Sequence, residues 1–147
     1  MYQNSDGSTD EPMPTLSPLT LPEDPESAWD FDSWTADAVA IHVGRNDFSE
    51  PVDQSAYESA YVAFLQTVRG HYPEALIVCI FGPMKSPLEQ VYTQNAVDTF
   101  ADPRVKLIEF PDPDPADGLG CDGHPSEATQ TKYGEILTKV LQAELGW

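Results

Sequence analysis

Residues 75–81 read ALIVCIF, and this stretch decides the fold. Seven consecutive apolar residues closed by Gly82-Pro83 are typical of a strand that is buried on both faces. Two further runs of strand length flank it along the chain, AVAIHV at residues 38–43 and VKLIEF at residues 105–110. Such strands belong to parallel sheets that are covered by helices, so we expect an α/β fold with about three parallel strands.

Amphipathic helical patterns separate and follow these runs, which predicts three main helices. Asp53 is placed to cap the first helix, and Pro125-Ser126 marks the start of the last one. The apolar face of the first helix comprises Tyr57, Tyr61, Phe64, Leu65 and Val68. The face expected for the second helix comprises Leu88, Val91, Tyr92, Asn95, Ala96 and Phe100. The face of the last helix comprises Ala128, Tyr133, Ile136, Leu137, Val140 and Leu141.

The 147 residues suit a single domain with a strongly negative charge. Seven Lys and Arg side chains stand against twenty-five Asp and Glu side chains, for a formal net charge of −18. This balance argues against binding to nucleic acid or to an anionic membrane surface, because both need clustered basic residues. No apolar run approaches the ~20 residues of a membrane span. Residues 1–11 show no signal-peptide pattern, so the localisation is left open.

Residues 1–35 differ from the rest and predict an extended, acidic arm ahead of a domain at residues 36–147. Five prolines interrupt any long helix there. The first basic residue of the chain is Arg45, after nine acidic ones. Trp29, Phe31 and Trp34 are more apolar than a disordered tail needs. We therefore expect at least the WDFDSW end, residues 29–34, to pack on the domain.

Polar residues gather where parallel strands end, which is where such sheets bind ligands. Gly44-Arg45-Asn46-Asp47 follows the first strand, and Cys121-Asp122-Gly123-His124-Pro125 lies between the third strand and the last helix. His124 is the best candidate for a general base, because imidazole exchanges protons near neutrality. The side-chain amide of Asn46 is suited to stabilise an oxyanion, and Gly44 permits a close turn. A surface histidine and an ordinary turn are the plainer interpretations.

Several alternatives remain open around His124. Asp122 either orients the imidazole or caps the next turn, and a main-chain carbonyl group is another candidate to orient the ring. Cys79 suits the core, whereas Cys121 either lies free beside His124, acts as a nucleophile with it or pairs with Cys79 in an exported chain.

No metal or cofactor is expected, because the acidic loop at residues 111–122 lacks the spacing of a calcium loop. His42 and His71 are interpreted as structural.

The motifs AVAIHVGRNDFS, FGPM and GCDGHPSEATQTKYGEILTKVLQAELGW resemble the C-terminal half of GDSL/SGNH hydrolases. The resemblance is greatest to carbohydrate esterase family 2, whose members are acetyl esterases acting on plant polysaccharides. It extends to MPTLSPLTLPEDPESAWDFDSW at residues 13–34 and so covers nearly the whole chain. It implies a flavodoxin-like three-layer α/β/α sandwich, incomplete here.

The resemblance also implies roles for individual residues. His124 would be the base that activates a serine, Asn46 would donate to the oxyanion, and Gly44 would shape that turn. Many of these hydrolases carry an aspartate three residues before the histidine. Here Cys121 holds that position and Asp122 follows it, as in the branch where a backbone carbonyl group orients the imidazole.

One element of the family pattern is absent from the printed sequence. The nucleophile is the Ser of a G-D-S motif at the end of an upstream strand, and none of the ten serines here lies in such a motif. We therefore expect an esterase for acetylated carbohydrates whose chain, taken alone, is inactive. The alternative is a non-catalytic module that binds carbohydrate or a partner, and a nucleotide-binding receiver domain is a weaker third interpretation.

A strand at residues 38–43 without its inner neighbour would expose an apolar edge. We expect that edge to promote self-association or pairing with a chain that carries the missing half.

Overall fold

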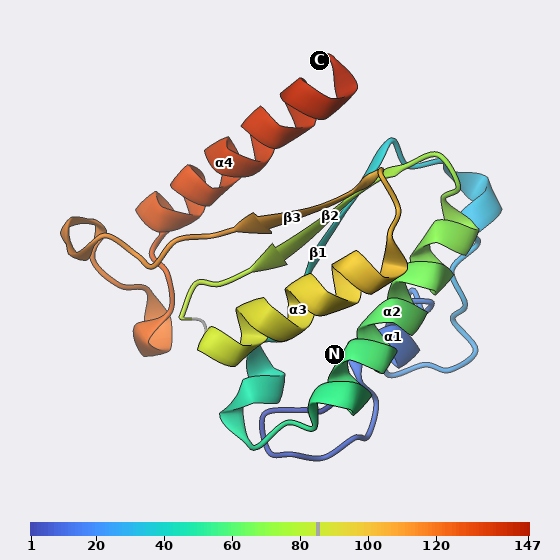
Figure 1. The fold of residues 1–147 in the computed structure, drawn as a ribbon, viewed down its shortest axis with the longest axis horizontal. Coiled ribbons are helices and arrows are strands. Elements are labelled where there is room, and N and C mark those ends of the chain that lie inside the picture. Colours follow the sequence, from blue (N-terminus) through green and yellow to red (C-terminus); the bar gives the residue numbers. More distant parts are fainter. Residues whose placement is uncertain (85) are drawn as a thin grey trace.

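The computed structural model describes residues 1–84 and 86–147 and confirms an α/β fold (Figure 1). Its sheet contains β1 (Ala38–His42), β2 (Leu76–Phe81) and β3 (Val105–Glu109) in the order β1-β2-β3. Both pairings are parallel, and Cys79 lies opposite Ile41 on one side and Leu107 on the other. All six residues of β2 are buried, as expected for the central strand.

Three long helices follow the strands at the predicted places. They are α2 (Gln54–His71), α3 (Pro87–Phe100) and α4 (Glu127–Leu145), and a short α1 (Met13–Leu16) lies in the N-terminal arm. The side chains of Asp53, Ser86 and Ser126 accept hydrogen bonds from backbone N–H groups in the first turns of the long helices. These caps satisfy donors that the helix itself leaves unpaired. None of the described helices is long and apolar enough to cross a membrane.

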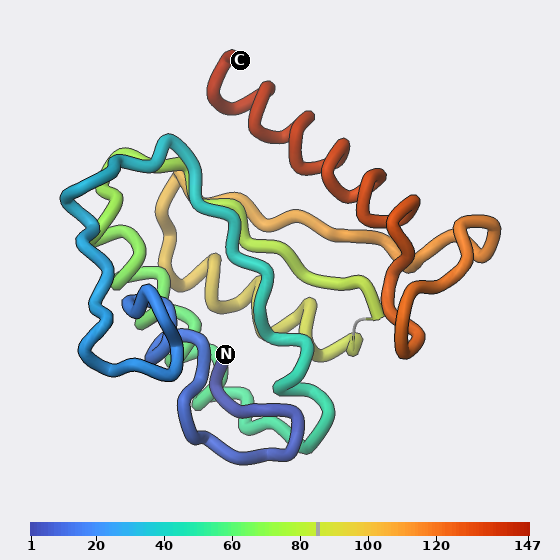
Figure 2. The backbone as a smooth tube through the Cα atoms, turned by 180° about the vertical axis from the view of Figure 1, so that it is seen from behind, coloured from blue at the N-terminus to red at the C-terminus, as the bar shows by residue number. Residues whose placement is uncertain are grey.

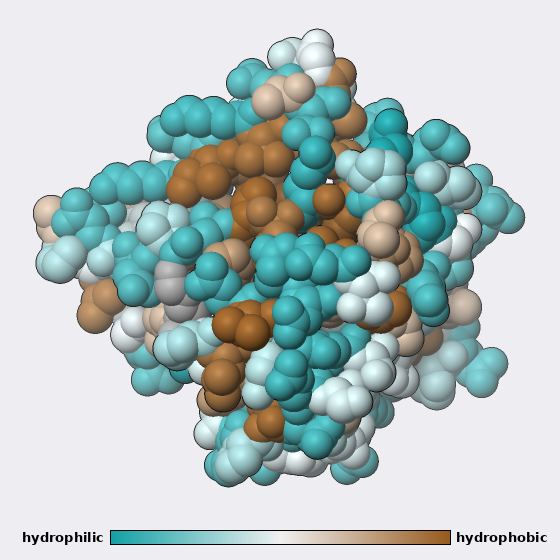
Figure 3. Space-filling view, viewed as in Figure 1, coloured by the Kyte–Doolittle hydropathy of each residue, from teal (hydrophilic) through white to brown (hydrophobic). Residues whose placement is uncertain are grey.

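The helices form two layers around the sheet. Helices α2 and α3 cover one face, and α4 covers part of the other (Figure 1). Ile77 and Cys79 of β2 face the first layer, whereas Leu76, Val78 and Ile80 face the second. Each face of β2 thus belongs to a separate core, which explains the uninterrupted apolar sequence of this strand. Apolar side chains remain visible at the surface between α4 and α3 (Figure 3).

The N-terminal arm is fastened to the domain at two places. Residues 1–3 donate three main-chain hydrogen bonds to the buried carboxylate of Asp47, at 2.5–2.8 Å. Further along, the ring of Phe31 stacks on His71 at a centroid distance of 3.6 Å. The described structure thus places both ends of the arm against the domain, although Trp34 is largely exposed.

β1 is an edge strand, and its free side opens into a cleft. Seen from behind, β1 lies in front of the other two strands (Figure 2). It pairs with β2 on one side, and no strand of the described residues pairs with its other side. The cleft has a volume of 690 Å³ and extends between the arm, β1 and α2. Its apolar lining includes Trp29, Phe31, Val39 and Phe64.

The buried face of α3 differs from the expected one. Leu88 and Val91 are about half exposed, whereas Glu89, Thr93 and Ala96 are buried. These three residues follow a helical spacing of four and three, so the helix is rotated relative to its apolar pattern. The rotation brings Thr93 within hydrogen-bond distance of Tyr57 on α2, with 3.1 Å between their hydroxyl oxygens. The expected face was therefore wrong for Leu88 and Val91, whereas Ala96 is buried and Tyr92 and Phe100 pack against the core as expected.

The buried carboxyl of Glu89 predicts a change in the pH dependence of stability. Burial raises its pKa above the ordinary value, against the opposing effect of the Ser86 and Gly82 amides and of Arg45 and His42. Its contribution to stability is then fully present below the unfolded pKa of about 4.3 and is lost as pH rises through the folded pKa.

Glu89→Gln should reduce the loss of unfolding free energy between pH 4 and pH 7, measured by urea unfolding at each pH. Glu135→Gln, at an exposed position of α4, is the control and should keep the wild-type pH dependence. An equal pH dependence in wild type and Glu89→Gln would contradict this account.

The packing of Tyr57 under the turn after β1 predicts a second, non-additive effect. Gly44 has φ +118°, and a Cβ atom there would clash with the Tyr57 hydroxyl. Gly44→Ala should lower the free energy of unfolding by about 1–3 kcal/mol, from overpacking and backbone strain. Tyr57→Phe removes the clashing oxygen, so Gly44→Ala/Tyr57→Phe should lose less than the sum of the two single variants, measured by denaturant unfolding. Additive losses would mean that the clash does not occur.

Candidate functional site

His124 is held by the backbone of its own loop. It follows the short 3₁₀ turn Cys121–Gly123, and its Nδ1 lies 3.1 Å from the carbonyl oxygen of Cys121. Because a carbonyl oxygen only accepts, Nδ1 carries the proton in this contact. The neutral ring then presents Nε2 as an acceptor, which is the state a general base needs.

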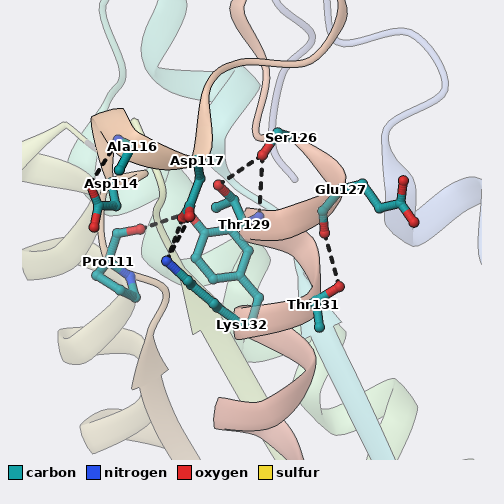
Figure 4. Close-up of polar contacts among 10 residues, drawn as sticks. Pro111, Asp114, Ala116, Asp117, Ser126, Glu127, Thr129, Thr131 and Lys132 are labelled. Carbon is teal, nitrogen blue, oxygen red and sulfur yellow. Dashed lines mark hydrogen bonds and ion pairs between the residues drawn. The ribbon is translucent and has the colours of Figure 1, made fainter.

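The loop that carries His124 is anchored to the first turns of α4 (Figure 4). Lys132 binds both carboxylate oxygens of Asp117 at 2.6 and 2.8 Å. The Tyr133 hydroxyl donates to the carbonyl oxygen of Pro111 at 2.7 Å, and the ring of Tyr133 stacks on Phe110. The helix thus fixes both the entrance of the loop and its middle, while the Ser126 cap follows His124 by two residues.

The turn after β1 brings Asn46 to the same place. Gly44 begins this turn, and the 3₁₀ helix η2 (Arg45–Ser49) continues it. Asn46 and His124 line one cavity of 340 Å³ together with His42, Gly82, Met84 and Gln130 among others. All three strands run in the same direction, so their following loops meet at this edge. Gly44 does not line this cavity; it shapes the turn that leads to Asn46.

Asp122 is not brought to the imidazole. It lies in the left-handed region with φ 54°, its side chain is exposed, and in the described residues no hydrogen bond joins it to His124. Of the alternatives left open by the sequence, the backbone carbonyl group is the one that contacts Nδ1. Cys79 is buried in the core and Cys121 is exposed, and both are free, so the structure contains no disulfide between them.

Two residues at this edge of the sheet were not expected there. His42 lines the cavity, and its Nε2 lies 2.5 Å from the carbonyl oxygen of Gly82, which joins the turns after β1 and β2. The N–H of Met84 donates to Asp112 at 3.1 Å and joins the turn after β2 to the loop of His124. The position of His42 at a strand end and the place of Met84 in the FGPM motif were the signals that the sequence offered.

The cavity contains a candidate base, His124, and an amide donor, Asn46. Among the described residues, no serine hydroxyl is hydrogen-bonded to His124. Ser49 is the serine that lines it, and its hydroxyl has no hydrogen bond to His124 within residues 1–84 and 86–147. In the same residues no group of three or more His, Cys, Asp or Glu side chains is arranged to hold a metal ion. The arrangement suits proton transfer and oxyanion stabilisation at an ester.

Comparisons with known proteins identify relatives. No family model matches the chain. The cellulase/esterase CelE of Acetivibrio thermocellus is 36% identical over 140 residues, which cover 88% of this chain and 17% of that protein. The acetylxylan esterase / glucomannan deacetylase of Cellvibrio japonicus is 23% identical over 151 residues, covering all of this chain and 42% of that protein.

The structural similarity is close. A family two carbohydrate esterase from Clostridium thermocellum, solved in complex with cellohexaose, superimposes with a TM-score of 0.92 and 33% identity. The match covers 99% of this chain and 47% of that one. The resemblance seen in the sequence motifs is thereby confirmed. The chain is related to the family two carbohydrate esterases, has their SGNH-type α/β fold, and spans about half the length of the solved enzyme that it matches.

Proposed function

We propose that this chain supplies the general base and the oxyanion donor of a serine esterase that removes acetyl groups from carbohydrates. The observation that carries the proposal is the shared cavity of His124 and Asn46, with Nδ1 of His124 bound to the Cys121 carbonyl oxygen. The names of the relatives, an acetylxylan esterase / glucomannan deacetylase and a cellulase/esterase, support an acetylated polysaccharide as substrate.

The chemistry follows from these two residues. Nε2 of His124 takes the proton of a serine hydroxyl, whose oxygen attacks the acetyl carbonyl carbon. The amide of Asn46 donates to the oxyanion of the tetrahedral intermediate. The imidazolium then protonates the departing sugar oxygen, and water repeats the sequence to release acetate. Asp122 has no part in these steps, since the Cys121 carbonyl group orients the ring.

The nucleophilic serine must come from a polypeptide segment that does not line the cavity in this structure. This requirement leads us to propose a partner polypeptide. We propose that the free edge of β1 and its cleft accept a polypeptide equivalent to the half of the relatives that this chain does not span. A strand parallel to β1 would end at the edge of the sheet where Asn46 and His124 lie. The cleft reaches that edge because His42 lines both the cleft and the site cavity.

A chimaera tests the catalytic proposal. The unmatched half of the Clostridium thermocellum esterase, joined to this chain, should hydrolyse 4-nitrophenyl acetate and acetylated xylan, whereas this chain alone should not. In the chimaera, His124→Ala should lower kcat/KM by about 10²- to 10⁴-fold, and Asn46→Ala by about 10²- to 10³-fold.

Gln130→Ala is the matched control, because Gln130 is a second carboxamide that lines the cavity. Activity of this chain alone that His124→Ala abolishes would point to a nucleophile within it. A folded but inactive chimaera that binds xylan would favour the non-catalytic carbohydrate-binding function.

A binding measurement tests the proposed partner. Sedimentation velocity should show a 1:1 complex between this chain and the unmatched half expressed separately. Trp29→Ala should weaken it, because Trp29 lines the cleft, whereas Trp34→Ala should not, because Trp34 lies outside that lining. Homodimers that persist in the presence of the separate half would instead assign the edge to self-association.

A further inference from the structure

Asp47 is a buried carboxylate that directly follows Asn46 in the chain. Its side chain is fully buried, and it accepts hydrogen bonds from three main-chain nitrogen atoms of the N-terminal arm. Its Oδ2 lies 2.8 Å from the nitrogen of Met1, and its Oδ1 lies 2.5 and 2.8 Å from those of Tyr2 and Gln3. A buried carboxylate is costly unless such donors compensate it. The arm and Asp47 therefore stabilise each other.

A further contact holds the backbone of the same turn. The side-chain Nε2 of Gln3 donates to the carbonyl oxygen of Asp47 at 2.8 Å and to that of Pro51 at 3.4 Å. Gln3 is itself buried. The arm thus binds Asp47 through both its carboxylate and its peptide carbonyl group, which fixes this residue at two points.

Asn46 lies inside the turn that these contacts fix. The N–H of Asp47 donates to the carbonyl oxygen of Gly44 at 3.0 Å and closes the first turn of η2 around Arg45 and Asn46. The side chain of Asn46 is exposed and, in the described part of the chain, has no hydrogen bond of its own. The backbone of the turn therefore determines where its amide lies.

The arm and the candidate site meet at this turn. A cavity of 330 Å³ is lined by Met1, Gln3 and Asn46 among others. Asn46 also lines the cavity of 340 Å³ that contains His124. Asn46 thus lies between the arm and the candidate base, and a shift of the arm would reach its amide through Asp47.

We propose that Asp47 is a positioning residue, the anchor through which residues 1–3 hold the amide of Asn46 in the cavity that it shares with His124. Because Asp47 is fully buried, it acts on the reaction only through the backbone of the turn. The role in catalysis rests on the proposed esterase function, whereas the coupling between the arm and the turn does not.

A simpler role for these contacts is to fasten the arm alone. Gln3→Met separates the two roles, because methionine has nearly the same shape but cannot donate to Asp47. Asn4→Leu is the matched control, since the carboxamide of Asn4 donates to Ser8 and Asp10 within the arm. Both variants replace a carboxamide by an apolar side chain of similar size, and we expect only Gln3→Met to loosen the turn.

Hydrogen exchange measured by NMR tests the coupling on the folded chain. Gln3→Met should accelerate exchange of the Asp47 N–H about tenfold, as expected for the loss of one hydrogen bond. It should also shift the side-chain amide resonances of Asn46, whereas Asn4→Leu should change neither. The N–H of Gly146, at the C-terminal cap of α4, is an internal reference that should stay the same.

Turnover of the chimaera tests the positioning role. Gln3→Met should lower kcat about tenfold and leave KM nearly unchanged, because an oxyanion donor acts in the transition state and its displacement is costly there. In an Asn46→Ala background, Gln3→Met should have no further effect on kcat, since the residue through which it acts is gone. A contact that serves stability alone would lower kcat equally in both backgrounds.

Asp47→Asn is a second variant for both readouts and replaces Gln3→Met if that variant does not fold. It keeps one oxygen for the arm and removes the charge, so it should act in the same direction. The inference is overturned if neither variant changes exchange at position 47, if Asn4→Leu changes it as much, or if Gln3→Met lowers kcat equally with and without Asn46. An inactive chimaera would count against the esterase proposal, and the exchange rates alone would then decide whether the arm and the turn are coupled.

Discussion

β2 is paired with a parallel strand on each side, and every one of its residues is buried. This arrangement determines the rest of the structure. Because all three strands end at the same edge of the sheet, the turns after β1 and β2 and the loop after β3 converge there. Asn46, Gly82 and His124 come from these three connections, although almost eighty residues separate the first from the last. The location of the site thus follows from the parallel direction of the strands, and the loops determine its detailed geometry.

Contacts between the three connections then give the site its shape. His42 joins the first two through the Gly82 carbonyl oxygen, and Asp112 joins the last two through the Met84 amide. On its outer side, α4 holds the loop of His124 through Lys132 and Tyr133. At the other edge of the sheet, the outer side of β1 is not paired with a strand of the described residues. The edge of β1 faces a cleft of 690 Å³, where we propose that a further polypeptide packs.

Much of this could be predicted from the sequence, because strands and helix starts have local signals. The apolar run at residues 75–81 predicted the central strand, and Asp53 predicted the start of α2. The buried face of α3 could not be predicted, since periodicity records where apolar side chains recur and not that Thr93 would contact the Tyr57 hydroxyl. Likewise, the partner of His124 is a backbone carbonyl group, which every residue possesses. From the sequence, Asp122 and a backbone carbonyl group were equally good candidates to orient His124. The geometry of the turn brings the Cys121 carbonyl oxygen to Nδ1.

We propose that His124 is a preformed general base, with Nδ1 bound to the Cys121 carbonyl oxygen, in the cavity that it shares with Asn46. The most direct measurement is the tautomer of His124, read from long-range ¹H–¹⁵N NMR correlations in the folded chain at a pH where imidazole is neutral. The structure predicts a protonated Nδ1, bound to the Cys121 carbonyl oxygen, and an unprotonated Nε2. A ring protonated at Nε2, or one that interconverts between both forms as in a free histidine, would contradict the account.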